Sequence, residues 1–367
     1  MAARQTEARD WVVSPGEILA EALEEREMSQ SELARRMGRP IKTINEIVNA
    51  KAALTPETAL QLEMVLGIPA SLWVNLEATY RRHLAERQTL ERFAGYEHWL
   101  KKFPIRDLVR HGLIKGEEPV ERQVSQLLTF FGAGSPDAWQ ERWGAPLAQY
   151  RKSASYEGSE HARGAWLRWG EILADGMTVD PFDAGRLRAV AERIRGLSRV
   201  SPIQAAIDEA QSELGAGGVA LVVVPEFDGT RLSGAARWLR HEVAIVQLSL
   251  RHKTDDHFWF SCMHEIGHIL DRPRHDFVDA MDAQPSDYED AEAEARADAF
   301  ARDVLLEPAA FQAFVARGAF DAMAVREFGE ERNVAPGIVV GRLQHDGLIP
   351  PSRLNNLKKA LRFDEHS

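Results

Sequence analysis

The chain has 367 residues, of which 44% are hydrophobic and 28% charged, with a formal net charge of −11 and a single cysteine. One cysteine excludes an internal disulfide framework, and the acidic balance excludes a nucleic-acid coat over the whole chain, though not one local basic face. No apolar run approaches the roughly 20 residues of a membrane helix, which excludes a membrane-spanning protein.

Residues 14–72 are predicted to form a run of short helices, two of which are separated by a glycine turn. Ser29 is placed as an N-cap with Glu32 three residues later, and Gly38 ends that helix. The next helix has an inward face of three branched apolar residues, Ile44, Ile47 and Val48. Two short helices joined in this way are the helix-turn-helix arrangement, whose second helix enters the DNA major groove.

The charge pattern favours DNA binding by that second helix. From Glu17 to Glu32 there are six acids against one base, whereas from Leu33 to Lys51 there are five bases against one acid. Phosphate repels the first segment and attracts the second. The alternative is a generic helical packing module with a solvated charged face.

Five residues form the predicted DNA-binding set. Lys42, Thr43 and Asn45 lie on the outward face of the second helix and can reach base edges or phosphates, and Arg39 lies in the turn before it. The stretch from SPGEIL to ASLW resembles the Cro/phage-repressor (XRE) helix-turn-helix family, closest to HigA-type antitoxins. This resemblance implies that Gln30 touches phosphate, and that the chain binds a double-stranded DNA operator as a homodimer.

The middle of the chain, residues 74–165, has helical patterns separated by the loop segments GAGSP and SYEGSE. Its four tryptophans are expected in a packed core, the alternative being a ligand cage: Trp139, Trp143, Trp166 and Trp169. The segment YRKSASYEGSEHARGAWLRWGE resembles a linker in HigA-like regulators fused to a peptidase-like domain.

The C-terminal half carries a metal-binding motif after a strand pattern. GVALVVV predicts a buried strand, and AARWLRHEVAIVQLSL predicts a hairpin. The following helix, DDHFWFSCMHEIGHIL, places His264 and His268 on one face with Glu265 adjacent, while Cys262 is expected in the core rather than at a redox gate. His-Glu-x-x-His arises by accident in about four chains in a hundred of this composition, so a third ligand must support it.

The third ligand is expected from the helix SDYEDAEAEARADAFARDVLLEP, which begins at a candidate cap, Ser286. Glu289, Glu292 and Glu294 are the candidates. Glu294 lies on the predicted core-facing stripe, where an unbound carboxylate is costly, whereas Glu292 shares a solvated face. Asp298 is placed to accept the other ring N–H of a ligand histidine.

Residues 185–345 resemble the ImmA/IrrE family of zinc metallopeptidases, with HEIGH and EARADAFARDVLLEP at its two metal-ligand segments. The resemblance implies one Zn²⁺ per chain, with Mn²⁺ as the alternative, bound by His264, His268 and Glu294. Glu265 is then the catalytic base, which deprotonates a water for attack on a peptide. The edge of strand 244–250 is expected to hold the substrate.

The oxyanion-stabilising residue stays open among five candidates: His241, His252, His257, His275 and Tyr288.

The sequence thus predicts an α+β, mostly helical protein in three parts. These are a helix-turn-helix domain over residues 1–75, a helical linker over 76–180, and a zincin-like domain with a small mixed β-sheet over 181–367. The first functional hypothesis is a cytoplasmic regulator that cleaves a repressor-type regulator, or itself, in a stress, toxin–antitoxin or phage-linked response. The second is a non-proteolytic antitoxin or autorepressor whose peptidase-like domain binds a toxin or a small effector.

Overall fold

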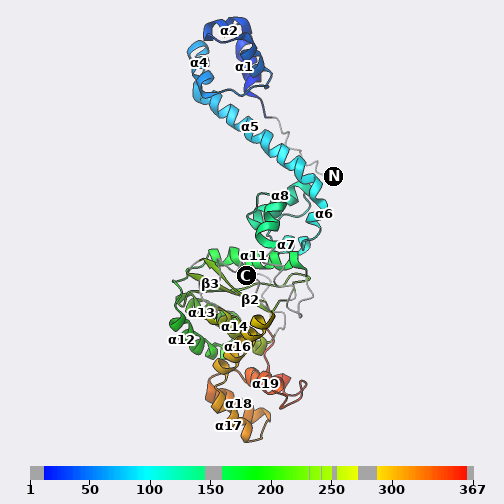
Figure 1. The fold of residues 1–367 in the computed structure, drawn as a ribbon, viewed down its shortest axis with the longest axis vertical. Coiled ribbons are helices and arrows are strands. Elements are labelled where there is room, and N and C mark those ends of the chain that lie inside the picture. The colour runs from blue at the N-terminus through cyan, green and yellow to red at the C-terminus, as the bar shows by residue number, and fades with distance from the viewer. Residues whose placement is uncertain are drawn as a thin grey trace, which may run out of the picture. The chain divides into compact units, whose positions relative to one another are not determined.

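The computed structural model describes residues 12–144, 159–230, 232–240, 242–249, 254–271 and 287–361, with the side chains of 287–290 outside the description. The chain forms two compact units, Met1–Glu97 with Pro119–Ser125 and His98–Glu118 with Gln126–Ser367 (Figure 1). The structure confirms a mostly helical protein with a small mixed sheet and an N-terminal helix-turn-helix. The boundaries predicted near residues 75 and 180 stay a prediction.

In the first unit, the helix that follows Ser29 begins and ends at the caps that the sequence predicts. The elements are α1 (Pro15–Glu24), α2 (Gln30–Met37), α3 (Ile41–Val48), α4 (Pro56–Leu66) and α5 (Ala70–Phe93). The Ser29 hydroxyl accepts the backbone N–H of Glu32 at 3.1 Å, and Gly38 ends α2 in the left-handed region, at φ 63°. These caps confirm the predicted limits of α2.

The core of the first unit sets the position of the predicted reading helix, α3. Ile44 and Ile47 are buried, as their spacing predicts, against Leu19, Leu33 and other apolar residues. A Cβ at Gly16 would lie 2.2 Å from the carbonyl oxygen of Ile47, so α1 crosses the end of α3 at backbone distance. This close packing leaves the opposite face of α3 outward.

The following helices contain the tryptophans of the middle region. They are η1 (Ala94–Tyr96), α6 (Glu97–Leu100), α7 (Ile105–Arg110), α8 (Val120–Phe131), α9 (Pro136–Trp139), η2 (Gln140–Gly144) and α11 (Glu160–Asp175). Trp139, Trp143 and Trp166 are buried, and Trp169 stacks on Phe227 with ring centroids 5.4 Å apart. The prediction that they pack in a core is confirmed.

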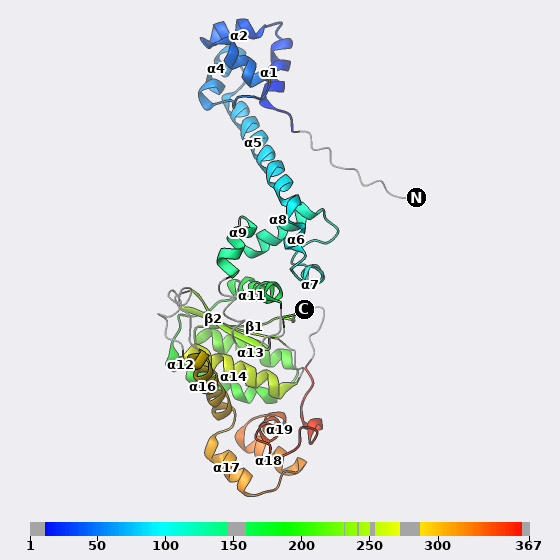
Figure 2. The same cartoon turned by 45° about the vertical axis from the view of Figure 1, so that its right-hand side comes forward.

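A three-stranded sheet forms the centre of the second unit, with α11 on one face and helices α13 and α14 on the other (Figure 2). Its elements are α12 (Ala184–Ile194), η3 (Arg195–Arg199), α13 (Ile203–Ala216), β1 (Val219–Val223), β2 (Gly234–Arg240), β3 (Val243–Leu248) and α14 (Asp255–Asp271). β1 runs parallel to β3, and β2 antiparallel to it. The predicted buried strand and hairpin are therefore confirmed.

The strand order β1-β3-β2 corrects one expectation about the substrate. β3 covers most of the segment 244–250, and it lies between the other two strands, so both of its edges are already paired. The prediction that this segment offers a free edge was wrong, because a hairpin pattern does not show which strand of the pair receives a third strand. Among the described strands, β2 is the edge that packs on α14.

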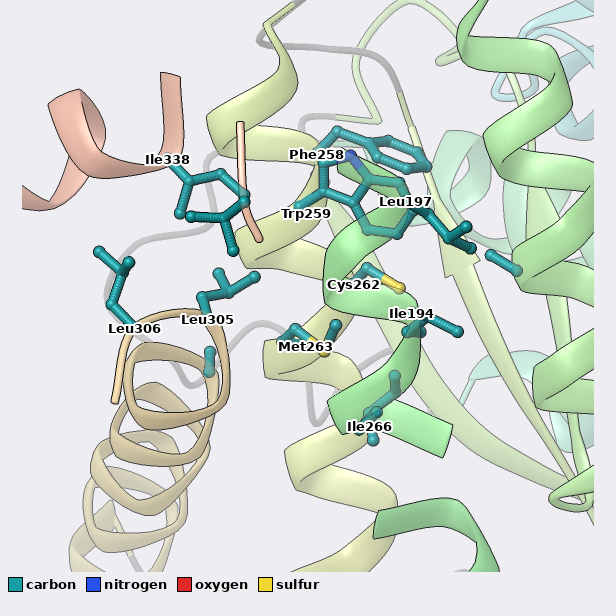
Figure 3. Packing of buried hydrophobic residues seen from close by; sticks show 14 of the residues in the cluster. Ile194, Leu197, Phe258, Trp259, Cys262, Met263, Ile266, Leu305, Leu306 and Ile338 are labelled. Carbon is teal, nitrogen blue, oxygen red and sulfur yellow. The ribbon is translucent and has the colours of Figure 1, made fainter. Parts of the chain in front are cut away.

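Helix α14 passes through the main core of the second unit (Figure 3). Trp259, Cys262, Met263 and Ile266 on this helix are fully buried. They pack with residues from α12, η3 and the C-terminal helices α16 (Asp287–Leu305), α17 (Pro308–Ala316), α18 (Ala322–Arg332), α19 (Pro336–His345) and η4 (Asn355–Leu357). Cys262 is 0% exposed within this core, which confirms the predicted packing, and burial raises the pKa of its thiol to about 12.

In the described residues, no helix combines the length and the apolar character that crossing a membrane requires.

Candidate metal centre and DNA-reading face

Helices α14 and α16 bring the three predicted metal ligands together. The Nε2 atoms of His264 and His268 lie 3.0 Å apart. Glu294 lies across from them, with its carboxylate oxygens 3.3 Å from each of these nitrogens. The residues predicted from i, i+4 spacing and from the next helix therefore form one cluster.

Two local features let α16 deliver Glu294 to the histidines. A Cβ at Gly267 would lie only 3.0 Å from the Cα of Ala297, so small residues on both helices allow a close approach. At the end of α14, the carboxylate of Asp271 accepts two hydrogen bonds from Arg296, at 2.7 and 2.9 Å. Sequence reasoning missed both features, because each is a contact between α14 and α16 that no pattern within one helix contains.

The donor set fits zinc. Two imidazole nitrogens and one carboxylate leave a fourth tetrahedral position open, as catalytic zinc sites require. A tetrahedral ion with bonds of about 2.0–2.1 Å separates its ligand atoms by about 3.3 Å, and the observed separations are 3.0, 3.3 and 3.3 Å. Asp298 lies 2.9 Å from Nδ1 of His264. When the ring proton is on Nδ1 and is donated to Asp298, the Nε2 lone pair is directed into the cluster, where an ion would bind.

The electrostatics of the cluster favour a positive charge at its centre. Burial has the largest effect on His264 and lowers its pKa, but the hydrogen bond to Glu294 and the charges of Glu265, Glu294 and Asp298 outweigh it, so the pKa is raised overall. The hydrogen bonds from His264 and His268 hold the pKa of Glu294 far below its usual range. A carboxylate held anionic beside two imidazoles is a favourable environment for a cation.

One premise of the ligand prediction was wrong. Glu294 was expected on a buried stripe, yet its side chain is 60% exposed. The stripe exists, with Ala297 and Ala301 buried, but Glu294 lies at its solvent end. Glu292 is 79% exposed and paired with Arg296, as predicted for a solvated face.

Glu265, the predicted base, is nearly buried beside His264 and lies against Gly234 of β2. Of the oxyanion candidates, His257 is exposed on α14, seven residues before His264. His241, His252 and His275 fall outside the described residues, as does the candidate cap Ser286. Tyr288 and Glu289 lie in α16, but their side chains are outside the description. No oxyanion donor is assigned.

Replacing Asp298 by alanine is expected to weaken zinc binding about 10- to 100-fold, because His264 loses the acceptor that orients its ring. Competition with a chelator of known affinity measures the change. Asp303→Ala, an exposed carboxylate on the same helix, is the matched control and should leave affinity unchanged. Equal affinities for the two variants would show that Asp298 does not orient the ligand.

The predicted DNA-binding residues lie in two places. Asn45 donates to the side-chain oxygen of Gln30 at 3.3 Å, which joins the middle of α3 to the start of α2, and Lys42 is 83% exposed. Thr43 is half-buried on the same helix. Arg39 instead turns toward α4, where it pairs with Glu57 at 3.1 Å and bonds Gln61. The structure therefore groups four of the five residues and separates Arg39.

Comparison with known proteins shows what the N-terminal region is similar to. Residues 19–73 match the helix-turn-helix family. An uncharacterized HTH-type transcriptional regulator, YddM of Escherichia coli (strain K12), is 38% identical over 73 residues, which cover 20% of this chain and 78% of that protein. Virulence-associated protein I of Dichelobacter nodosus is 36% identical over 76 residues, covering 20% and 70% respectively.

A solved structure, an addiction module antidote protein of a HigA family from Coxiella burnetii, shares 31% sequence identity over 22% of this chain and 90% of its own, with a TM-score of 0.21. The sequence match with YddM spans more than two thirds of that regulator. A helix-turn-helix is also what the structure shows in this region, where α2 and α3 are joined by a turn that begins at Gly38. Through residues 19–73, the chain belongs to the helix-turn-helix family of transcriptional regulators.

Proposed function

We propose that the chain is a transcriptional regulator that also carries a zinc-dependent endopeptidase site. The observation that carries this proposal is the convergence of His264, His268 and Glu294, with Glu265 adjacent and Asp298 behind the first histidine. A helix with two incidental histidines has no reason to meet a carboxylate and an orienting acid from a second helix at ligand spacing.

Four residues of the site have a chemical role in this proposal. His264, His268 and Glu294 hold the ion, which supplies Lewis-acid polarisation of the peptide carbonyl when bound. The Glu265 carboxylate takes a proton from the attacking water and passes it to the leaving nitrogen. Because Glu265 is only 9% exposed, the proton is exchanged in a poorly solvated space, which strengthens these electrostatic interactions.

The substrate we propose is an extended segment of a repressor-type regulator, or of this chain itself. β2 is an edge strand among the described strands, and it packs on the helix that carries Glu265. An edge strand binds an extended peptide through its unpaired backbone groups. The DNA-binding region on the same chain couples such cleavage to gene control in the cytoplasm.

A non-proteolytic antitoxin or autorepressor is the second candidate, with the C-terminal region binding a toxin or a small effector. The observation that favours it is that His264, His268 and Glu294 also hydrogen-bond one another directly. Such a cluster can stabilise the packing of α14 on α16 without catalysing a reaction.

Metal content and proteolysis decide between the two candidates. Purified protein is analysed for zinc and incubated with helix-turn-helix regulators encoded near its gene and with itself, alongside Glu265→Gln. One zinc per chain with cleavage by the wild type alone supports the peptidase. Protein without metal, or equal absence of cleavage in both under inducing conditions, supports the second candidate.

Replacing Lys42 and Thr43 together by alanine is expected to weaken operator binding about 30-fold or more, since groove contacts contribute about 1–3 kcal/mol each and about 1.4 kcal/mol is a factor of ten. The operator is first selected from random duplex DNA, and binding is measured by fluorescence anisotropy, which also reports whether two copies bind one palindrome. Arg87→Ala, a charge removal on exposed α5, is the control. If the double variant binds like the control, α3 is not the reading helix.

A further inference from the structure

Gly234, the first residue of β2, lies directly against the side chain of Glu265. A Cβ built on Gly234 would lie 2.6 Å from Oε1, 2.8 Å from Cγ and 3.0 Å from Cδ of Glu265. Optimal separations between nonbonded carbon atoms are about 3.5–4.0 Å. Any side chain at this position must therefore displace either the carboxylate or the strand.

The backbone does not require glycine at this position. Gly234 has no positive φ, unlike the turn glycines Gly229 and Gly218. Glycine inside a strand costs entropy and packing, and it commonly marks a place where another group approaches closely. Glycine is therefore needed at this position because it lacks a side chain, and not because the backbone has a special conformation.

The alternation along β2 shows that the gap is local. Residues 234, 236 and 238 share the face that turns toward α14. Ala236 and Trp238 keep their side chains on that face and pack in the core of the second unit. Side chains on this face of β2 thus become larger with distance from Glu265, and the residue that lies against Glu265 has no side chain.

The strand is held at this position by its pairing with β3. Gly234 is in register with Leu248 of β3, which is fully buried, and the antiparallel ladder continues through Ala236. Glu265 has rotatable side-chain bonds and contacts Gly234 through its terminal atoms. A methyl group at residue 234 is therefore expected to move the carboxylate rather than the sheet.

We propose that Gly234 is a positioning residue, which keeps the Glu265 carboxylate between the edge strand and the metal-binding histidines. The steric contact between Gly234 and Glu265 does not depend on the proposed peptidase function, whereas its effect on catalysis rests on that function. Gly234 lies in neither metal-ligand segment, so it acts on where the base is held and not on whether the ion binds.

Crystal structures of metal-free wild type and Gly234→Ala test the contact. The expected result is a different side-chain rotamer of Glu265 in the variant, with β2 unmoved. In thermal unfolding, the substitution should lower Tm in the wild-type background but not in Glu265→Ala, which lacks all three contacting atoms. A Glu265 in its original place, or equal Tm losses in both backgrounds, would overturn the proposal.

Kinetics test the positioning role. Gly234→Ala should lower kcat about 10- to 100-fold through misplacement of the base, with KM and zinc content unchanged. Gly134→Ala is the matched control, because no atom lies within 4 Å of a Cβ built there. An unchanged kcat despite a moved Glu265 would overturn the positioning role. If the wild type cleaves nothing, the peptidase function fails, while the crystal structures and the Tm comparison still decide the contact.

Discussion

Glu265→Gln is expected to retain one zinc per chain and to lose about 10²- to 10⁴-fold in kcat, the range for removal of a general base. Glutamine has nearly the same shape, so the contact with Gly234 and the buried position are kept. What disappears is the ability to take a proton. Because His264, His268 and Glu294 are unchanged, the loss belongs to proton transfer and not to the ligands.

The measurement compares the rate of substrate cleavage with the zinc content of the same samples. Glu292→Gln, which neutralises an exposed carboxylate on α16, is the matched control and should cleave at the wild-type rate. A Glu265→Gln protein that cleaves as fast as this control would remove Glu265 from the mechanism. A variant that loses its zinc would assign Glu265 to the metal-binding set instead.

The candidate ligand cluster could be predicted from the sequence only in part by helical spacing. The i, i+4 spacing places His264 and His268 on one face, whereas the helical wheel and the resemblance to the ImmA/IrrE family indicate Glu294. The predicted burial of Glu294 failed for a related reason. A helical wheel gives the direction of a side chain, while exposure depends on where the partner helix ends.

Other features depended on contacts that no local pattern contains. The central place of β3 follows from the parallel pairing of β1, and the turning of Arg39 toward α4 follows from Glu57 and Gln61. Gly234 and Gly267 have no chemistry to attract notice in a sequence. Their importance is visible only as the distance from a missing Cβ to a neighbouring element.

The same is true of the attachment of the C-terminal residues to α14. Lys358 donates to the carboxylate of Asp256 at 2.6 Å, with the two side chains 11% and 7% exposed. Next to this pair, Asp255 accepts the backbone N–H of Lys359 at 2.9 Å. A Cβ at Gly341 of α19 would lie 2.7 Å from Asp256, so the glycine makes room for the buried carboxylate.

Lys358→Met is therefore expected to lower the free energy of unfolding by about 3–5 kcal/mol, the cost of leaving one partner of a buried ion pair uncompensated. Methionine keeps most of the aliphatic stem, so packing against α14 changes little. Urea unfolding followed by circular dichroism and tryptophan fluorescence measures the loss in the second unit. A loss below about 1 kcal/mol would show that this pair behaves like a solvent-exposed one.

Two further variants separate charge from packing. Lys358→Met with Asp256→Asn should regain most of the stability, because no unpaired charge remains.

Asp255→Asn should cost little stability, or even stabilise the fold, at neutral pH. Burial is the largest influence on Asp255 and raises its pKa, so the folded state favours the protonated form and loses stability as pH rises through that pKa. The two neighbouring carboxylates should thus respond in opposite directions, because Asp256 forms a close ion pair with Lys358, whereas the charge of Lys359 influences Asp255 less than burial does.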